Sequence, residues 1–162
     1  MRSNVLALGV AAILASSAMV GVIGNEAVAA PTYVGVEGSN IAVSGYDTVS
    51  YFSGSGVPVK GNAKFAVKHD GAVYHFPNAE NASRFAADPA AFAPQFGGHC
   101  AWAMARGYLA PADPEQYAVV DGKLYLNFNA EVKAKWDKDR SGFITSGHKN
   151  WKKVPADAKF GG

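Results

Sequence analysis

Asp70-Gly71-Ala72-Val73-Tyr74 recurs 51 residues later as Asp121-Gly122-Lys123-Leu124-Tyr125, and these two stretches decide the fold. The match continues at the same offset, where Asn78-Ala79-Glu80 reappears as Asn129-Ala130-Glu131. Each Asp-Gly pair suits the positive φ angles of a tight hairpin turn, and each Asn suits the N-cap of a helix. The sequence therefore predicts an internal repeat, in which one β-hairpin-plus-helix motif occurs twice.

The repeat also predicts where the remaining elements lie. We expect strands at 64–69 and 72–76 in the first copy and at 117–120 and 123–128 in the second, each pair followed by a helix. Between the copies, residues 96–107 are mostly apolar, with glycines at the start and a glycine at the end, which predicts a central apolar helix. Hairpins with helices packed against them make a small, single-domain α+β fold.

The N-terminal stretch indicates export. Arg2 is followed by an uncharged, mostly apolar run at 5–24 and then by Ala27-Val28-Ala29, which is typical of a secretory signal peptide and its cleavage site. We expect cleavage and a periplasmic or secreted protein; an uncleaved membrane anchor is the alternative. The predicted divisions are a signal peptide at 1–29, an N-terminal lead at 30–40, the domain at 41–152 and a flexible C-terminal tail at 153–162.

The net charge and the single cysteine limit which functions the protein can have. The formal net charge is +2, and the basic residues are scattered until a small C-terminal cluster, so there is no electrostatic case for nucleic acid as a partner. Cys100 is the only cysteine, which excludes an intramolecular disulfide. A lone thiol in an oxidising compartment is explained by burial, by redox chemistry or by metal ligation.

The residues around Cys100 suggest a metal site. Cu(I) prefers thiolate, thioether and imidazole ligands, and Cys100, Met104 and His99 carry these groups. On a helix, Cys100 and Met104 share one face, and a helix beginning near Gly98 would stabilise the Cys100 thiolate through its dipole. Met104 also suits a packed core position. Copper is the expected ion, with zinc as the alternative.

His75 is the expected second ligand. It lies in the second predicted strand, where the other copy has Leu126. If that face of the strand is core, the imidazole must be hydrogen-bonded or must ligate a metal. We expect it to meet Cys100, with Asp47 as a further ligand; a core histidine bonded to a backbone carbonyl is the alternative.

Four motifs extend over most of the domain. They are Gly45-Tyr46-Asp47-Thr48-Val49-Ser50-Tyr51-Phe52, Tyr74-His75-Phe76, Phe85 with Asp88-Pro89, and Gly97-Gly98-His99-Cys100-Ala101-Trp102. Together, from Ile41 to Trp151, they resemble the YHS domain family, in particular its exported, single-cysteine branch. The resemblance implies a small α+β domain; relatives attached to heavy-metal transporters are thought to bind metal through cysteines. The corresponding positions here are Ser50, Pro77 and Asn81, so that cysteine site is not carried over.

Three functions follow as hypotheses. The leading one is an exported metal-binding module in which Cys100, His75 and His99 bind copper, with Met104 or Asp47 as a further ligand. The second is a non-catalytic module that binds a ligand or an exported protein partner, with Cys100 and His75 as structural core residues. The third is a thiol enzyme with Cys100 as nucleophile. Contact with a membrane is expected only if the signal sequence is uncleaved.

Overall fold

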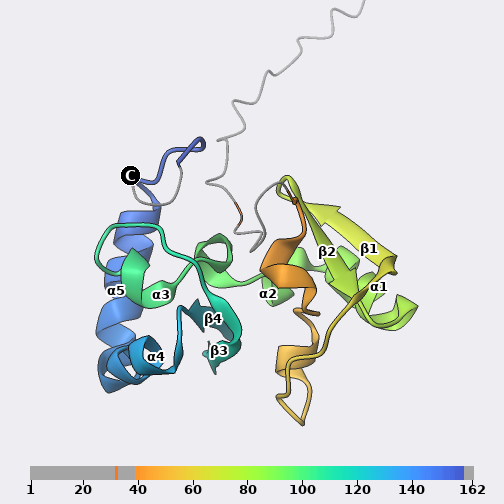
Figure 1. Cartoon of the computed structure of the whole chain (residues 1–162), viewed down its shortest axis with the longest axis horizontal. Helices are drawn as coiled ribbons and strands as arrows, with labels where there is room; N and C mark the ends of the chain where they lie inside the picture. Colours follow the sequence, from red (N-terminus) through yellow and green to blue (C-terminus); the bar gives the residue numbers. More distant parts are fainter. Residues whose placement is uncertain (1–31, 33–38, 159–162) are drawn as a thin grey trace, which may run out of the picture.

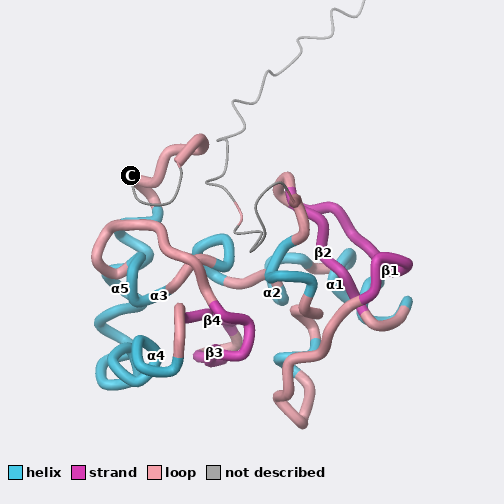
Figure 2. The backbone as a smooth tube through the Cα atoms, viewed as in Figure 1, coloured by secondary structure: helices cyan, strands magenta, loops and turns pink. Residues whose placement is uncertain are grey.

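The computed structural model describes Thr32 and residues 39–158. The predicted signal peptide and most of the N-terminal lead lie outside the described residues. Within them, the fold is α+β as predicted: two separate antiparallel sheets, each of two strands, lie beside short helices (Figures 1 and 2). None of the described helices has the length and apolar character that a membrane crossing needs.

The first unit consists of β1 (Asn62–His69), β2 (Ala72–Phe76), α1 (Ala79–Ala87) and α2 (Pro89–Phe92). Its hairpin turn places Asp70 and Gly71 at φ 46° and 75°, the left-handed conformation that glycine adopts most readily and that Asp tolerates. The helix α1 begins where the Asn78 side chain accepts a hydrogen bond from the Asn81 N–H at 2.8 Å. Phe85 fixes α1 to the hairpin, because its ring is fully buried.

The second unit consists of β3 (Asp113–Val120), β4 (Lys123–Asn127) and α4 (Ala130–Trp136). Asp121 and Gly122 make its turn at φ 50° and 70°, and Asn129 caps α4 by accepting from the Val132 N–H at 2.8 Å. Trp136 is fully buried, as Phe85 is in the first unit. The hairpins and the helices after them therefore lie at the predicted positions. That the two units are copies of one internal repeat stays a prediction.

The connection between the units differs from the predicted central helix. Gln95–Gly98 forms a 3-10 turn in which Phe96 and Gly97 are left-handed, at φ 56° and 59°. The chain then runs extended through Cys100, whose N–H donates to the Ala110 carbonyl at 3.0 Å, and α3 covers only Ala101–Met104. The prediction of a helix over 96–107 is wrong in extent, because left-handed residues interrupt the i to i−4 hydrogen bonds that a helix needs.

The longest helix, α5 (Arg140–Trp151), was not predicted. It begins at Asp139, whose side chain accepts from the Gly142 N–H at 3.0 Å. Gly147 lies against the Phe96 ring, and a Cβ at this position would overlap the ring at 2.6 Å. The glycine therefore lets α5 approach the connection between the units closely.

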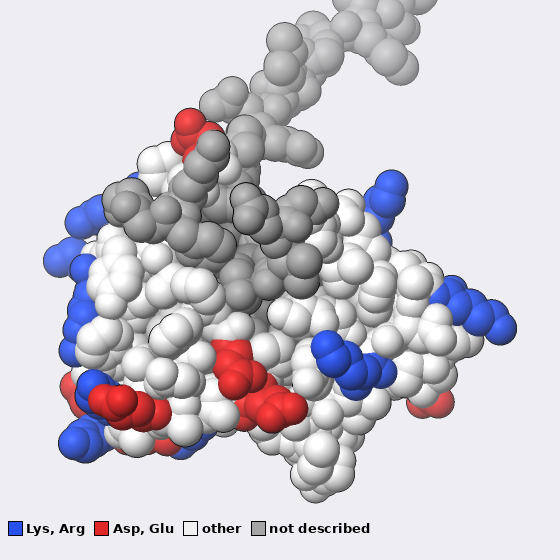
Figure 3. Space-filling model, in the orientation of Figure 1, with Lys and Arg blue, Asp and Glu red and all other residues white. Residues whose placement is uncertain are grey.

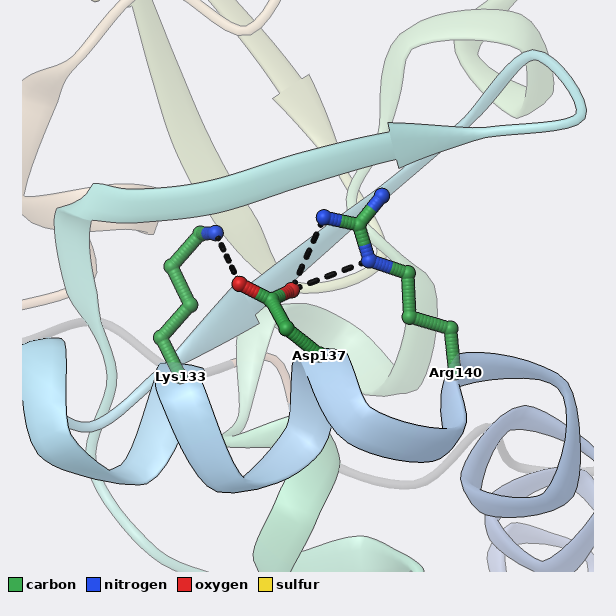
Figure 4. Close-up of polar contacts among 3 residues, drawn as sticks. All are labelled: Lys133, Asp137 and Arg140. Atoms are coloured by element: carbon green, nitrogen blue, oxygen red, sulfur yellow. Dashed lines mark hydrogen bonds and ion pairs between the residues drawn. The ribbon is translucent and has the colours of Figure 1, made fainter.

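A small charge network joins α4 to the start of α5. Asp137 accepts from Lys133 at 2.7 Å, and Arg140 donates to the other carboxylate oxygen at 2.9 Å (Figure 4). Burial opposes ionisation, but the hydrogen bonds and charges of Lys133 and Arg140 lower the pKa of Asp137. On the face drawn in Figure 3, the basic side chains lie in separate groups, most of them at the rim and one nearer the middle, beside acidic side chains.

The buried side chains form two clusters. The first cluster packs the first hairpin and α1 against Leu124 and Leu126 of β4. The second contains Tyr125, from the other face of β4, together with Met104 and Trp136. As a result, β4 is buried on both faces, whereas β2 has one buried face and one partly exposed face.

Candidate functional site

Cys100 belongs to the first core cluster, with 1% of its surface exposed. Its backbone pairs with Leu126 of β4, and its Sγ lies 3.9 Å from the Oδ1 of Asn127 as a weak hydrogen bond. Burial raises the pKa of the Cys100 thiol above its ordinary value. The expectation that a helix dipole stabilises the thiolate is therefore wrong: Cys100 precedes a helix of one turn, and desolvation outweighs the surrounding hydrogen bonds.

Met104 does not share a face with Cys100. Cys100 has φ −56° and ψ 118°, outside the helical region, so the spacing of four residues does not align the two side chains. Met104 belongs to the second core cluster and Cys100 to the first. The expectation of a common thiolate and thioether face is corrected accordingly.

His99 points away from Cys100. Both residues are extended, at ψ 159° and 118°, and successive side chains of an extended chain point to opposite sides. The His99 ring is buried and lies 6.0 Å from the ring of Trp151 in α5. The imidazole therefore lies beside α5, while the thiol lies beside Asn127 at the end of β4.

His75 occupies the partly exposed face of β2. It borders a surface hollow of about 280 Å³, where it meets Gly45, Lys60 and Gly61. A Cβ at Gly61 would overlap the backbone carbonyl of His75, so glycine is required for this close approach. The core environment expected for His75 by analogy with Leu126 is wrong, because β4 is buried on both faces whereas the face of β2 that carries His75 is partly exposed.

Asp47 is fully buried in a hydrogen-bonded centre of its own. Its carboxylate accepts from the Val49 N–H at 2.9 Å and from the Asn81 side-chain amide at 2.6 Å. The Ser50 hydroxyl donates to the Asp47 carbonyl at 2.6 Å. Burial raises the pKa of Asp47, while the bonds from Asn81, Val49 and Ser50 and the charge of Arg84 act in the opposite direction.

The Asp47 centre contains two of the positions at which the YHS resemblance places cysteines, namely Ser50 and Asn81. Their side chains bond the carbonyl and the carboxylate of the same residue. The chemistry at this point is hydroxyl, amide and carboxylate, which ties the loop at Asp47 to α1. No thiol is available there, because Cys100 lies in a separate environment beside Asn127.

The five predicted ligands are thus distributed over several environments. Among Thr32 and residues 39–158, no three His, Cys, Asp or Glu side chains are arranged to hold one metal ion. Copper or zinc binding by this set stays a prediction.

A different group of side chains meets around a hollow of about 200 Å³, which we call the inter-unit hollow. It is lined by Thr32, Asp70, Tyr74, Ala93, Pro94, Gln95, Phe96, Gly97, His148 and Trp151. Asp70 and Tyr74 come from the first hairpin, Gln95 from the connection, and His148 and Trp151 from α5. In the sequence, the only signal of this site is the helical spacing of His148 and Trp151, in a stretch for which no helix is predicted.

One phenol lines the inter-unit hollow, and another contacts a residue of its lining. The Tyr74 hydroxyl is hydrogen-bonded to the Thr32 side chain, and burial raises the pKa of Tyr74 to about 12. The Tyr125 hydroxyl lies 3.4 Å from Nε2 of His148. Both phenols stay protonated near neutral pH, so they offer hydrogen bonds rather than charge.

No family model matches the chain, and neither the curated proteins nor the solved structures give a match. The resemblance to the YHS family, which rests on the motifs quoted above, stays a prediction.

Proposed function

We propose that the chain is a non-catalytic binding module whose ligand is a small molecule held in the inter-unit hollow. The observation that carries the proposal is the convergence of polar side chains from separate segments, Asp70, Gln95 and His148, on one hollow beside an aromatic ring. Such a combination of a few polar groups with aromatic walls is typical of small-molecule sites. Export, as expected from the N-terminal stretch, would make it a periplasmic or secreted binder.

The chemistry of Cys100 favours binding over thiol catalysis. A nucleophilic cysteine needs an accessible thiolate, whereas Cys100 is buried and its thiol pKa is raised. Its neighbours in the core are mostly apolar side chains, and Asn127 supplies its hydrogen bond. We therefore assign Cys100 a structural role in this proposal.

Another hollow, of about 310 Å³ beside Met104, is a weaker candidate. Its polar lining side chains are Tyr108, Asn150 and Lys153. Asn150 already donates to the carbonyls of Met104 and Ala105, at 3.0 and 3.2 Å. Most of the remaining lining is apolar. Its polar groups come from the loop after α3 and from the end of α5 with the residues after it, whereas the inter-unit hollow receives polar groups from three separate segments.

The proposal is tested by mapping amide chemical shifts of the mature protein against a mixture of neutral, anionic and cationic molecules no larger than choline. We expect shifts at Asp70, Gln95 and His148, and their loss in Gln95→Trp, which fills the hollow. Ala90→Trp is the matched control, because Ala90 is exposed on α2 and lies outside the lining. Thermal melts verify that both variants fold.

The soft-metal hypothesis is tested in the same material. Titration with Cu(I) should give no site whose occupancy depends on Cys100, so Cys100→Ala and the unaltered protein should take up equal amounts. Stoichiometric uptake that Cys100→Ala abolishes, with no shifts around the hollow, would overturn the proposal in favour of a metal-binding module.

A further inference from the structure

We infer that the ligand of the inter-unit hollow is a small organic cation, bound by the carboxylate of Asp70 and the ring of Trp151. The inference rests on the proposed function and specifies the chemical class of its ligand. It follows from three properties of the hollow: its charge, its aromatic wall and its size.

The described lining carries one carboxylate and neither Lys nor Arg. Asp70 is the only Asp or Glu among the described lining residues, and neither Lys nor Arg is among them. One carboxylate oxygen of Asp70 lies 3.3 Å from Nε2 of His69, which forms an ion pair only when that imidazole is protonated. The Asp70 side chain is 54% exposed, so its carboxylate is accessible to a ligand cation. Among the described lining side chains, only the imidazole of His148, when protonated, could offset the repulsion between this carboxylate and an anionic ligand.

The aromatic wall suits the same class. Trp151 is partly buried, with its ring 6.2 Å from that of Phe96 and 6.0 Å from that of His99. Indole is the best ring for a cation, and such contacts contribute about 0.5–2 kcal/mol depending on desolvation. A carboxylate and an indole around one hollow therefore attract a positive charge from two directions.

The size of the hollow sets an upper limit on the ligand. Drug-sized ligands occupy pockets of roughly 300–1,000 Å³, whereas this hollow has about 200 Å³. Choline or a short primary amine suits this volume.

The position of Asp70 is fixed by the left-handed turn it forms with Gly71, so its carboxylate is held at the tip of the first hairpin.

The second hairpin provides a matched control. Asp121 occupies the corresponding turn position with φ 50°, and it does not line the hollow. Asn tolerates left-handed backbone as well as Asp does, so Asp70→Asn and Asp121→Asn remove one charge each without new backbone strain.

Calorimetric titration of the mature protein with choline and with its uncharged carbon isostere, dimethylbutanol, tests the inference. Choline should bind at least tenfold more tightly than the isostere, Asp70→Asn should lose at least tenfold in choline affinity, and Asp121→Asn should keep it. Trp151→Leu should also weaken choline binding, which provides a second variant independent of the turn.

Two failures are distinguishable. If the isostere binds as tightly as choline, or Asp70→Asn binds choline normally, while shifts still map to the hollow, the cation inference is overturned and the proposed function stands. If neither probe binds and the molecular mixture shifts no amide around the hollow, the proposed function itself fails.

Discussion

The loops before Asp47 and before Cys100 have nearly the same backbone. Each contains a left-handed pair, Val43 and Ser44 at φ 51° in one and Phe96 and Gly97 at φ 56° and 59° in the other. Each then brings one residue into the interior, with its N–H bound to a carbonyl: Asp47 to Val59 at 2.8 Å and Cys100 to Ala110 at 3.0 Å.

The chemistry of the two buried residues nevertheless differs. Asp47 meets the amide of Asn81 on α1 and forms a network, whereas Cys100 meets mostly apolar side chains and one weak acceptor on β4. The shared loop conformation therefore determines which residue is buried. The side chains of the elements packed against that residue determine which hydrogen bonds it can form.

The largest expected effect is at Asp47. Asp47→Ala removes the acceptor of the Val49 N–H and of the Asn81 amide, and we expect it to lower the free energy of unfolding by about 3 kcal/mol. Urea unfolding at neutral pH measures this. Asp113→Ala is the control, because Asp113 accepts a similar bond from the Glu115 N–H at an exposed site; equal losses in the two variants would contradict a special role for burial.

A smaller effect is expected at Cys100. Cys100→Ala leaves a cavity the size of one sulfur atom, and we expect a loss of about 1 kcal/mol. Because burial raises the thiol pKa, a thiol-specific reagent should label the folded protein far more slowly than the protein in urea. Rapid labelling without denaturant would show that the thiol is accessible and would revive the enzyme hypothesis.

The pH dependence of Asp47 gives a finer test. Burial raises its folded pKa above 3.8, so the folded state holds the proton more tightly than the unfolded state does. The quantity to compare is the free energy of unfolding of the unaltered protein minus that of Asp47→Asn. This difference should be largest below pH 3.8 and should decline as the pH rises through the raised pKa. Paired urea titrations across this range measure it; an advantage that grows with pH would mean that the hydrogen bonds outweigh burial.

The smallest effect is expected in the Lys133–Asp137–Arg140 network. The corresponding residue in α1 is Ala86, so this network distinguishes the second unit from the first. Asp137→Ala should cost about 0.5 kcal/mol at low ionic strength and less at high salt, because exposed pairs are weak and screened. Thermal melts at two salt concentrations check this, and a loss independent of salt would indicate a packing effect instead.

The hairpins and helix caps could be predicted because their signals are local. Asp-Gly turns and Asn caps act over a few residues, and the structure places all four at the expected positions. The connection could not be predicted in the same way. Val43 and Phe96 adopt the left-handed conformation although they are not glycines. Their side chains do not favour positive φ, so the sequence does not predict this conformation.

The predicted ligand set illustrates what spacing does not determine. Cys100 and Met104 are four residues apart, but only a continuous helix would align them, and the helix begins after Cys100. His75 and Leu126 occupy equivalent strand positions, yet β4 is buried on both faces and β2 on one. The inter-unit hollow is lined by residues of the first hairpin, the connection and α5, which are far apart in the sequence, so no short motif encodes it.

The burial of the only thiol has a practical consequence for handling the protein. In the folded state the sulfur cannot reach a second chain, so folded molecules should not become covalently linked through it. A dimer band on a non-reducing gel would therefore report molecules that opened during storage or export, and its intensity would measure how often the first core comes apart.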